Sequence, residues 1–213
     1  MQGKNAAKTV ERRLVVASGN KDKIGEIKAI LSPFFDEIMS QKEAGLELDV
    51  EETGLTFEEN ALLKARAAAK LLACAVIADD SGLCVDCLGG EPGVHSARYA
   101  GEQHDDADNL QKLISECAKY AAPRPAKFVS VAALVFPDGA EVVARGEVSG
   151  EIILEPRGEN GFGYDPVFFY PPLGKTFAQL GFEEKNAVSH RRNALMKLRE
   201  AFREAVPKCL PKR

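Results

Sequence analysis

The chain has 213 residues, more than a small domain needs and fewer than two domains usually take, and its 45% hydrophobic and 28% charged residues are ordinary for a globular protein. A formal net charge of −4 gives no general attraction for nucleic acid, so any phosphate-bearing partner must be held by locally placed lysines and arginines. These values argue against a nucleic-acid-binding protein and favour small nucleotides as ligands.

The N-terminal segment and the cysteines indicate the cellular compartment in which the protein is expected. Residues 1–12 contain no apolar run of seven or more, so we expect a flexible tail there, neither signal peptide nor membrane span, and a single domain over residues 13–213. Five cysteines, an odd number without an export signal, indicate reduced thiols in the cytoplasm. Cys84 and Cys87 form a C-x-x-C, but no second pair exists, and we interpret them as packed thiols in preference to a zinc or redox site.

The first half of the chain predicts a strand followed by two helices. A β-branched run over residues 14–18 stops at a Gly19–Asn20 turn, after which Ile24, Ile27 and Leu31 recur at helical spacing. Thr56 and Glu59 have the spacing of a capping box, and apolar residues then recur every three or four positions. The second helix is therefore expected from about residue 57 to residue 72.

The second half predicts further strands and a closing helix. An apolar run over residues 73–78 ends at an acidic pair, residues 89–93 have loop composition, and residues 108–117 have helical periodicity. Residues 127–136 and 141–149 are predicted to be strands joined by a turn at 137–139, and residues 166–170 a short strand. An amphipathic helix is expected to begin near Ser189 and to end before Pro207. Helices interleaved with strands, followed by a hairpin, indicate a mixed sheet covered by helices.

The first polar cluster is a turn that enters a helix. It supplies a hydroxyl, a glycine and two lysines where free N–H groups and the helix dipole favour an anion. The pattern is a candidate phosphate cradle, although it is not the G-x-x-x-x-G-K-[ST] loop, and solvated surface is the alternative. Its residues are Ser18, Gly19, Asn20, Lys21, Asp22 and Lys23.

Acidic residues form the second and third clusters. Glu51 and Glu52 precede the second helix, and one glutamate could join Asp80 around Mg²⁺, which takes carboxylate and phosphate oxygens. Asp79 and Asp80 must point to opposite faces while the strand lasts, so one carboxylate is expected to serve chemistry and the other to give support. The alternative is a loop in which the aspartates and Ser81 cap backbone groups.

A fourth cluster combines an aromatic, glycine-rich segment with basic residues. The segment 161–165 precedes Lys185 and Asn186 and then the run 189–192. An aromatic ring between glycines can stack on a flat base, and lysine, histidine and arginine can donate to base oxygens or phosphates. The alternative is a core aromatic pair beside a basic helix start. His95 and His104 lack helical metal-ligand spacing, so zinc is not expected.

Taken together, these segments resemble a known enzyme family. The matching motifs are Ser18-Gly-Asn-x-x-Lys23, Glu52-Thr-Gly-x-Thr-Phe-x-Glu-Asn60, Ala78-Asp-Asp-Ser-Gly-Leu83, Gly161-Phe-Gly-Tyr-Asp-Pro166 and Ser189-His-Arg191, in order and with regular spacing from about residue 14 to residue 203. The chain resembles the inosine/xanthosine triphosphate pyrophosphatase family, which hydrolyses deaminated purine nucleoside triphosphates such as ITP, dITP and XTP to the monophosphate and pyrophosphate.

The resemblance implies a role for each cluster. Asp80 is expected to act as general base and, with Glu52, to hold Mg²⁺. The phosphates would be held by the turn from Ser18 to Lys23 and by Lys64, with Ser81 beside the substrate. Phe162 would stack on the purine. The remaining substrate-binding residues implied by the resemblance are Gly163, Tyr164, Asp165, Lys185, His190 and Arg191.

The family also implies a fold and an assembly. We expect an α/β fold with an elongated mixed sheet flanked by helices, in two lobes with the active-site cleft between them, and a homodimer. A nucleotide sensor without turnover is the main rival, and a pyrophosphatase for other modified or pyrimidine triphosphates is the nearer one. Phe162, Lys185 and Arg191 favour a 6-oxopurine, because their donors would meet the 6-amino group of ATP as donor against donor.

Overall fold

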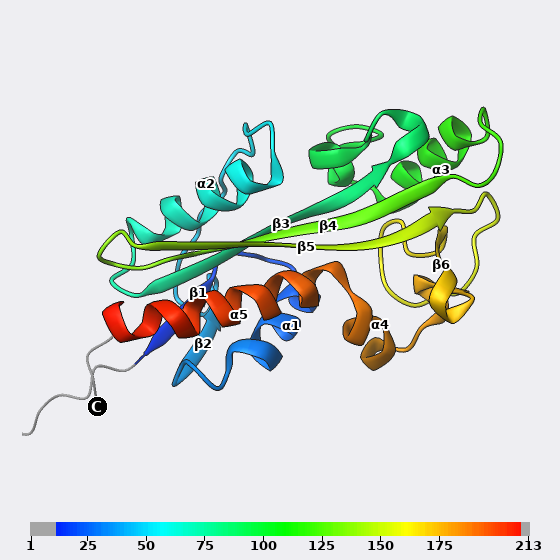
Figure 1. Ribbon diagram of the computed structural model, residues 1–213. Coiled ribbons are helices and arrows are strands. Elements are labelled where there is room, and N and C mark those ends of the chain that lie inside the picture. The colour runs from blue at the N-terminus through cyan, green and yellow to red at the C-terminus, as the bar shows by residue number, and fades with distance from the viewer. Residues whose placement is uncertain (1–11, 210–213) are drawn as a thin grey trace, which may run out of the picture.

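A seven-stranded mixed sheet forms the centre of the computed structural model, which describes residues 12–209 (Figure 1). The strand order is β2-β1-β3-β4-β5-β6-β7; β2, β1 and β3 are parallel, and the remaining neighbours are antiparallel. The strands are β1 (Arg13–Val16), β2 (Glu37–Ser40), β3 (Ala75–Val85), β4 (Pro125–Val135), β5 (Glu141–Ile152), β6 (Phe168–Tyr170) and β7 (Lys175–Thr176).

Helices cover both faces of this sheet. Helix α2 packs on one face, whereas α1 and α5 pack on the other, and α3 lies at the far end of the long strands (Figure 1). The α-helices are α1 (Lys21–Leu31), α2 (Phe57–Ala69), α3 (Asp106–Cys117), α4 (Phe182–Val188) and α5 (His190–Cys209). Short 3-10 helices are η1 (Asp86–Leu88), η2 (Gly93–Arg98), η3 (Pro171–Leu173) and η4 (Phe177–Gln179).

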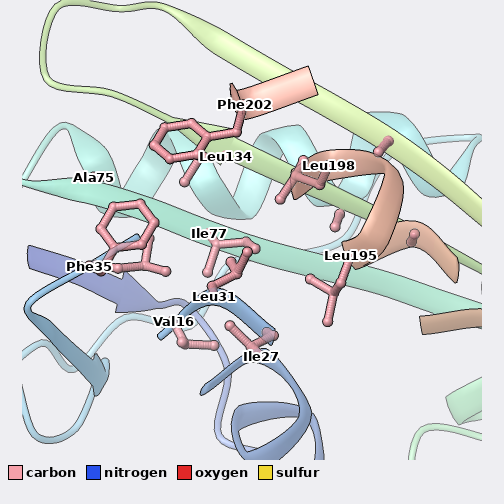
Figure 2. Packing of buried hydrophobic residues seen from close by; sticks show 14 of the residues in the cluster. Val16, Ile27, Leu31, Phe35, Ala75, Ile77, Leu134, Leu195, Leu198 and Phe202 are labelled. Carbon is pink, nitrogen blue, oxygen red and sulfur yellow. The ribbon is translucent and has the colours of Figure 1, made fainter. Parts of the chain in front are cut away.

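Alternation along β1 and β3 divides the apolar residues between the two faces. Val16 and Ile77 belong to the cluster under α1 and α5, and Figure 2 shows them facing Ile27 and Leu195 of these helices. Their neighbours in sequence, such as Val76, belong to the cluster under α2. Each large apolar side chain buried in this way contributes roughly 1.5–3 kcal/mol. The period of two therefore decides which helix each strand residue meets.

The long strands β3, β4 and β5 run on into a second lobe, which has a core of its own. That core joins their distal halves to α3 and to the segment over residues 152–180. Phe128, Phe168 and Phe177 form its aromatic centre, with Phe128 and Phe168 ring centroids 4.5 Å apart. The predicted α/β fold, with a mixed sheet, flanking helices and two lobes, is confirmed.

Several predicted elements are found with shifted boundaries. The capping box of Thr56 and Glu59 is present at the start of α2, and the hairpin of β4 and β5 turns over residues 136–140. The expectation that the strand ends at the acidic pair is wrong, because β4 pairs with β3 from Val76 through Val85. Helices α2 and α5 end at Ala69 and Cys209, not near residues 72 and 206. Strand β2 and helix α4 were not predicted.

The predicted tail lies outside the described residues except for Arg12, which donates from its backbone and guanidinium to Asp36. Between residues 12 and 209, no helix combines the length and hydrophobicity needed to cross a bilayer. Cys84 and Cys87 are free thiols that pack against different apolar clusters.

Candidate active site

A cleft of about 530 Å³ opens beside β3 at the point where β1 ends. Pairing between β1 and β3 stops at Val16 and Ile77, and one further bond joins the Ala17 N–H to the Ile77 carbonyl at 2.8 Å. Strand β3 continues to Val85 with β4 on its other edge. The polar stretch of β3 therefore lies past the end of its parallel neighbour, outside the carboxyl ends of the parallel strands, where α/β sheets commonly bind ligands.

Most of the residues predicted for the site gather in this cleft. Two do not line it: Lys21 is exposed, and Asp80 lies next to the wall through its contact with Lys64. The side chain of Asp22 is outside the described part of the structure. The cleft is lined by the predicted residues Ser18, Gly19, Asn20, Lys23, Glu52, Lys64, Ser81, Phe162, Gly163, Tyr164, Asp165, Lys185, His190 and Arg191.

The turn before α1 brings backbone donors to one end of the cleft. The Asn20 side chain accepts from the Lys23 N–H at 3.2 Å, and the Asn20 N–H donates to Ser18 Oγ at 3.1 Å. These bonds fix the turn directly before the first residues of α1, whose N-terminal dipole favours an anion. The turn and Lys23 line this end of the cleft, where the sequence predicted a phosphate cradle.

Asp79 lies on the face of β3 that packs against α1 and α5, where it is paired with two cations. Its Oδ1 is 2.5 Å from Lys23 Nζ and 3.5 Å from Arg191 Nε, and its Oδ2 accepts from Ser130 Oγ at 2.6 Å. Burial disfavours the charged form of Asp79, but the charges of Lys23 and Arg191 outweigh it and lower its pKa. Asp79 is therefore ionised at neutral pH and pairs with two cations.

Asp80 lies on the opposite face, toward α2, and is less well compensated. Its Oδ1 is 3.3 Å from Lys64 Nζ, which is also 2.6 Å from Glu52 Oε1. Burial, together with the charges of Glu52 and Asp79, raises the pKa of Asp80 although Lys64 opposes the shift. Its Oδ2 is buried without a hydrogen-bond partner among residues 12–209. Asp80 therefore has an acceptor available for a proton, a water molecule or a cation.

The loop that carries Glu52 is fixed against the start of α2. The side-chain oxygen of Asn60 accepts from the Gly54 N–H at 2.8 Å, and an Arg98 guanidinium nitrogen lies 3.4 Å from the Glu52 carbonyl oxygen. A Cβ on Gly54 would come within 2.6 Å of Asn60 Oδ1, so no larger residue fits there without movement. These contacts place the Glu52 carboxylate against Lys64.

The opposite end of the cleft holds the aromatic segment. Asp165 accepts from the Phe162 N–H at 2.9 Å and forms an ion pair with Lys185. Lys185 Nζ also lies 4.7 Å from the centre of the Phe162 ring, which is 38% exposed. Tyr164 is buried and donates its hydroxyl to the Ser96 carbonyl at 2.7 Å. Phe162 thus offers an accessible face, whereas Tyr164 anchors the segment.

The start of α5 places a histidine and an arginine at the floor of the cleft. Ser189 Oγ accepts from the Arg192 N–H at 3.0 Å, as expected of an N-cap. His190 stacks on Phe128 with ring centroids 4.9 Å apart, and burial and the charge of Arg191 lower its pKa well below the usual value. His190 is therefore neutral at pH 7, with one nitrogen able to donate and the other to accept.

The donor set fits a cation only together with a substrate. Within the described part of the chain, no group of three or more His, Cys, Asp or Glu residues gathers to hold a metal ion. Glu52 and Asp80, however, both contact the Lys64 ammonium and leave an unpartnered Oδ2 at Asp80. Magnesium usually takes one or two carboxylates with substrate phosphates and water, so this pair suits a metal that arrives with a triphosphate.

Comparisons with known proteins identify the family. The model of the Ham1 family matches residues 14–201, which include every residue of the cleft wall. The chain belongs to the Ham1 family. It is 50% identical over 191 residues to the dITP/XTP pyrophosphatase of Staphylococcus aureus strain MRSA252, covering 90% of this chain and 96% of that one. The Bacillus subtilis dITP/XTP pyrophosphatase is 47% identical over 190 residues, covering 89% and 96% of the two chains.

Solved structures of the Ham1 family agree with this membership. The structure of the Staphylococcus aureus Ham1 protein has a TM-score of 0.81 and 49% identity, covering 91% of this chain and 99% of that one. The Ham1 protein from Coxiella burnetii has a TM-score of 0.82 and 43% identity, with coverages of 91% and 99%. The resemblance inferred from the sequence motifs is confirmed.

Among the residues that the sequence did not predict, three contact Asp79 or a predicted site residue. Glu26 of α1 contacts Arg191, Ser130 of β4 contacts Asp79, and Phe128 stacks on His190. Each belongs to a run that is otherwise apolar or helical, and its partner is far away in sequence, so no local pattern connects the two. A glutamate on the buried side of an amphipathic helix is the one signal that pointed to Glu26.

Proposed function

We propose that this Ham1 family member hydrolyses deaminated purine nucleoside triphosphates, such as ITP, dITP and XTP, to the monophosphate and pyrophosphate. Two relatives named dITP/XTP pyrophosphatases are about half identical to the chain over most of its length. The observation that carries the proposal is the meeting of Glu52 and Asp80 at Lys64, one end of a cleft whose other end presents Phe162 and Lys185. The enzyme would keep these nucleotides out of DNA and RNA precursors.

In the proposed reaction, a water molecule attacks the α-phosphorus and the bond to the β-phosphate breaks. Asp80 takes a proton from this water through its unpartnered oxygen, because its raised pKa makes it a stronger base than an ordinary aspartate. The leaving pyrophosphate gains charge, which Lys23 and Lys64 neutralise from fixed positions. Positive charge that is already in place needs no reorganisation during the reaction, and this supplies much of the acceleration.

Magnesium is part of the proposal. Glu52 and Asp80 would hold it with the phosphates, and the ion would supply charge stabilisation at the phosphate oxygens. The carboxylate of Asp79 is already committed to Lys23 and Arg191, so it is the less suitable ligand.

Base selection is proposed to occur at Lys185 and Arg191. Both are donors without acceptor capacity, so they match the 6-oxo group of hypoxanthine or xanthine and mismatch the 6-amino group of adenine. Because these donors are largely buried, a mismatch leaves them unpaired and costs binding free energy. The exposed face of Phe162 would stack on the purine ring. A homodimer and a cytoplasmic location complete the proposal. The family resemblance supports the first, and the odd number of cysteines supports the second.

The deciding experiment compares ITP, dITP, XTP, GTP, ATP and dUTP with the purified full-length chain and magnesium, with pyrophosphate and orthophosphate measured separately. Pyrophosphate is expected as the direct product, with kcat/KM for ITP at least about a hundredfold above that for ATP. Orthophosphate as the direct product would refute the proposed bond cleavage. Equal rates on ITP and ATP would remove the role of Lys185 and Arg191 in selection, and no turnover of any triphosphate would favour the nucleotide sensor.

A further inference from the structure

Glu26 is a buried carboxylate that the proposed reaction does not use. It lies on α1, is 6% exposed, and comes 165 positions before its partner Arg191. Its Oε1 accepts from Arg191 Nη1 at 3.1 Å, whereas its Oε2 is buried without a hydrogen-bond partner among residues 12–209. Burying a charge and leaving one of its oxygens unpaired is costly, and an apolar residue of similar volume often stabilises a fold as well or better. A functional reason for Glu26 is therefore needed.

Glu26 is one of three contacts that fix the guanidinium of Arg191. Arg191 Nη1 donates to Glu26 on α1, Nη2 donates to Ser81 Oγ at 3.2 Å, and Nε lies 3.5 Å from Asp79 Oδ1. A guanidinium is planar, so contacts at all three nitrogens set both its position and the direction of its plane. The Arg191 side chain is 2% exposed and lines the cleft, so small shifts of this plane would change what it presents there.

The contacts leave part of Arg191 for a ligand. A guanidinium has five N–H donors, and the hydrogen bonds to Glu26 and Ser81 use one on Nη1 and one on Nη2, whereas Nε is held by its ion pair with Asp79 without a hydrogen bond among residues 12–209. One N–H on Nη1 and one on Nη2 are left for a ligand. A 6-oxopurine presents two adjacent acceptors, O6 and N7, whereas adenine presents a donor and an acceptor at the same edge. Two parallel donors held in a fixed plane distinguish these patterns, and a guanidinium free to rotate does so less well.

We propose that Glu26 is a positioning residue that sets the discrimination between 6-oxo and 6-amino purines by holding the plane of Arg191. This inference rests on the proposed function, since it assigns Arg191 to the base edge. Ser81 and Asp79 belong to one strand, so Glu26 supplies the contact from a different element, α1. Without it, Arg191 remains charged and buried but loses the contact that fixes Nη1.

The test measures equilibrium binding of IMP and AMP to the full-length wild type and to Glu26→Gln, which keeps the size of the side chain and removes its charge. The ratio of the two dissociation constants is expected to fall about tenfold in Glu26→Gln, mainly through weaker binding of IMP, the loss expected for a hydrogen bond to a charged group. The ratio of kcat/KM for ITP and ATP is expected to fall by a similar factor. Glu26→Met, of similar volume but apolar, is expected to show the same loss.

Two controls separate positioning from general damage. Glu141→Gln breaks the exposed Arg66–Glu141 pair, whose Nε–Oε1 distance is 2.7 Å, and is expected to leave the IMP/AMP ratio unchanged. In an Arg191→Met background, Glu26→Gln is expected to change the ratio by less than about twofold, because residues that act through each other are not additive. A residue of purely structural importance would shift both backgrounds alike.

The outcomes keep the two proposals apart. An unchanged IMP/AMP ratio in the folded Glu26 variants, or an equal loss with and without Arg191, would overturn the positioning role. A wild type that binds IMP in preference to AMP but hydrolyses no triphosphate would overturn the proposed function, while the binding ratios would still decide the role of Glu26.

Discussion

On one face of strand β3, Asp79 meets Lys23 and Arg191, whereas on the other face Asp80 meets Lys64 alone. The two aspartates are neighbours in sequence and both are buried, yet the pKa of Asp79 is lowered and that of Asp80 is raised. Burial disfavours the charge of both carboxylates. The difference comes from the balance of neighbours, since two cations outweigh burial at Asp79, and Glu52 adds repulsion at Asp80.

The comparison shows how one strand can give two neighbouring aspartates different roles, one in support and one in chemistry. A carboxylate held by two cations, as Asp79 is, is a poor base because its proton affinity is low. A carboxylate with a raised pKa and an unused oxygen is a better one. The period of two along β3 is enough to give each aspartate a different helix as its neighbour, α1 with α5 for Asp79 and α2 for Asp80.

The largest expected effect is on turnover by Asp80→Asn. Removing a general base typically costs 10²–10⁴-fold, so we expect kcat for ITP to fall about a thousandfold while IMP still binds. Stability is expected to change in the opposite direction. A raised folded pKa means that the folded state holds the proton more tightly, so ionised Asp80 destabilises the fold at neutral pH. The neutral variant should therefore melt at a higher temperature than wild type, measured without added metal.

The Asp80 prediction fails in two distinct ways. Turnover of ITP within tenfold of the wild-type rate would assign the base elsewhere. A lower melting temperature would mean that the ion pair with Lys64 stabilises ionised Asp80 by more than burial destabilises it. The pKa of Asp80 would then be lowered, as that of Asp79 is, and the difference between the two faces of β3 would be absent.

Asp79→Asn is expected to have the next largest effect, this time on stability. The substitution leaves Lys23 and Arg191 buried with reduced compensation, which costs about 3 kcal/mol in the free energy of unfolding. The midpoint of urea unfolding at pH 7 measures it. Asp36→Asn is a matched control, since Asp36 pairs with Arg12 at a half-exposed position and should contribute less than about 1 kcal/mol.

The dependence of stability on pH below about pH 4 also tests whether Asp79 is charged and paired. Because the folded pKa of Asp79 is lowered, its contribution is present above its unfolded pKa of about 4 and is lost as the pH falls below that toward the folded value. Asp79→Asn should therefore lose less stability than wild type between about pH 4 and pH 2. Parallel profiles for the two proteins would contradict a charged, paired Asp79.

Much of this arrangement could be predicted from the sequence, because the informative signals are local. The capping box at Thr56, the turn before α1 and the hairpin of β4 and β5 depend on residues a few positions apart, and all three are present. Alternation along a strand also predicted that Asp79 and Asp80 point in opposite directions. The motifs predicted which side chains would gather, and the cleft contains most of them.

The parts that were missed depend on contacts between distant segments. The apolar pattern stops at Ala78, so the sequence suggested a strand end, but β4 continues to pair with β3 and ion pairs satisfy its polar residues. The partner of Glu26 is on α5, and no local pattern connects them. Strand β2 is a short edge strand of four residues, and its sequence has no strong periodicity.

Ser130 is another of the missed residues, and its removal is expected to have the smallest of these effects. It lies in the middle of β4, fully buried, and donates to Asp79 Oδ2 at 2.6 Å on the face opposite to Asp80. Ser130→Ala removes a hydrogen bond to a charged group and leaves a buried oxygen unpaired, which should cost about 2 kcal/mol in urea unfolding. Turnover of ITP should change less than threefold, because the Asp80 face is untouched.

The effect of Ser130→Ala on stability should also become smaller once Asp79 has no charge. In an Asp79→Asn background, the same substitution is expected to cost about 1 kcal/mol less, since the hydroxyl then donates to a neutral amide oxygen. An equal cost in both backgrounds would mean that Ser130 stabilises the protein through strand packing. Its hydrogen bond to Asp79 would then not contribute to the difference between the two aspartates. A large loss of turnover with unchanged stability would instead connect Ser130 to the Asp80 face, which the alternation of β3 and β4 argues against.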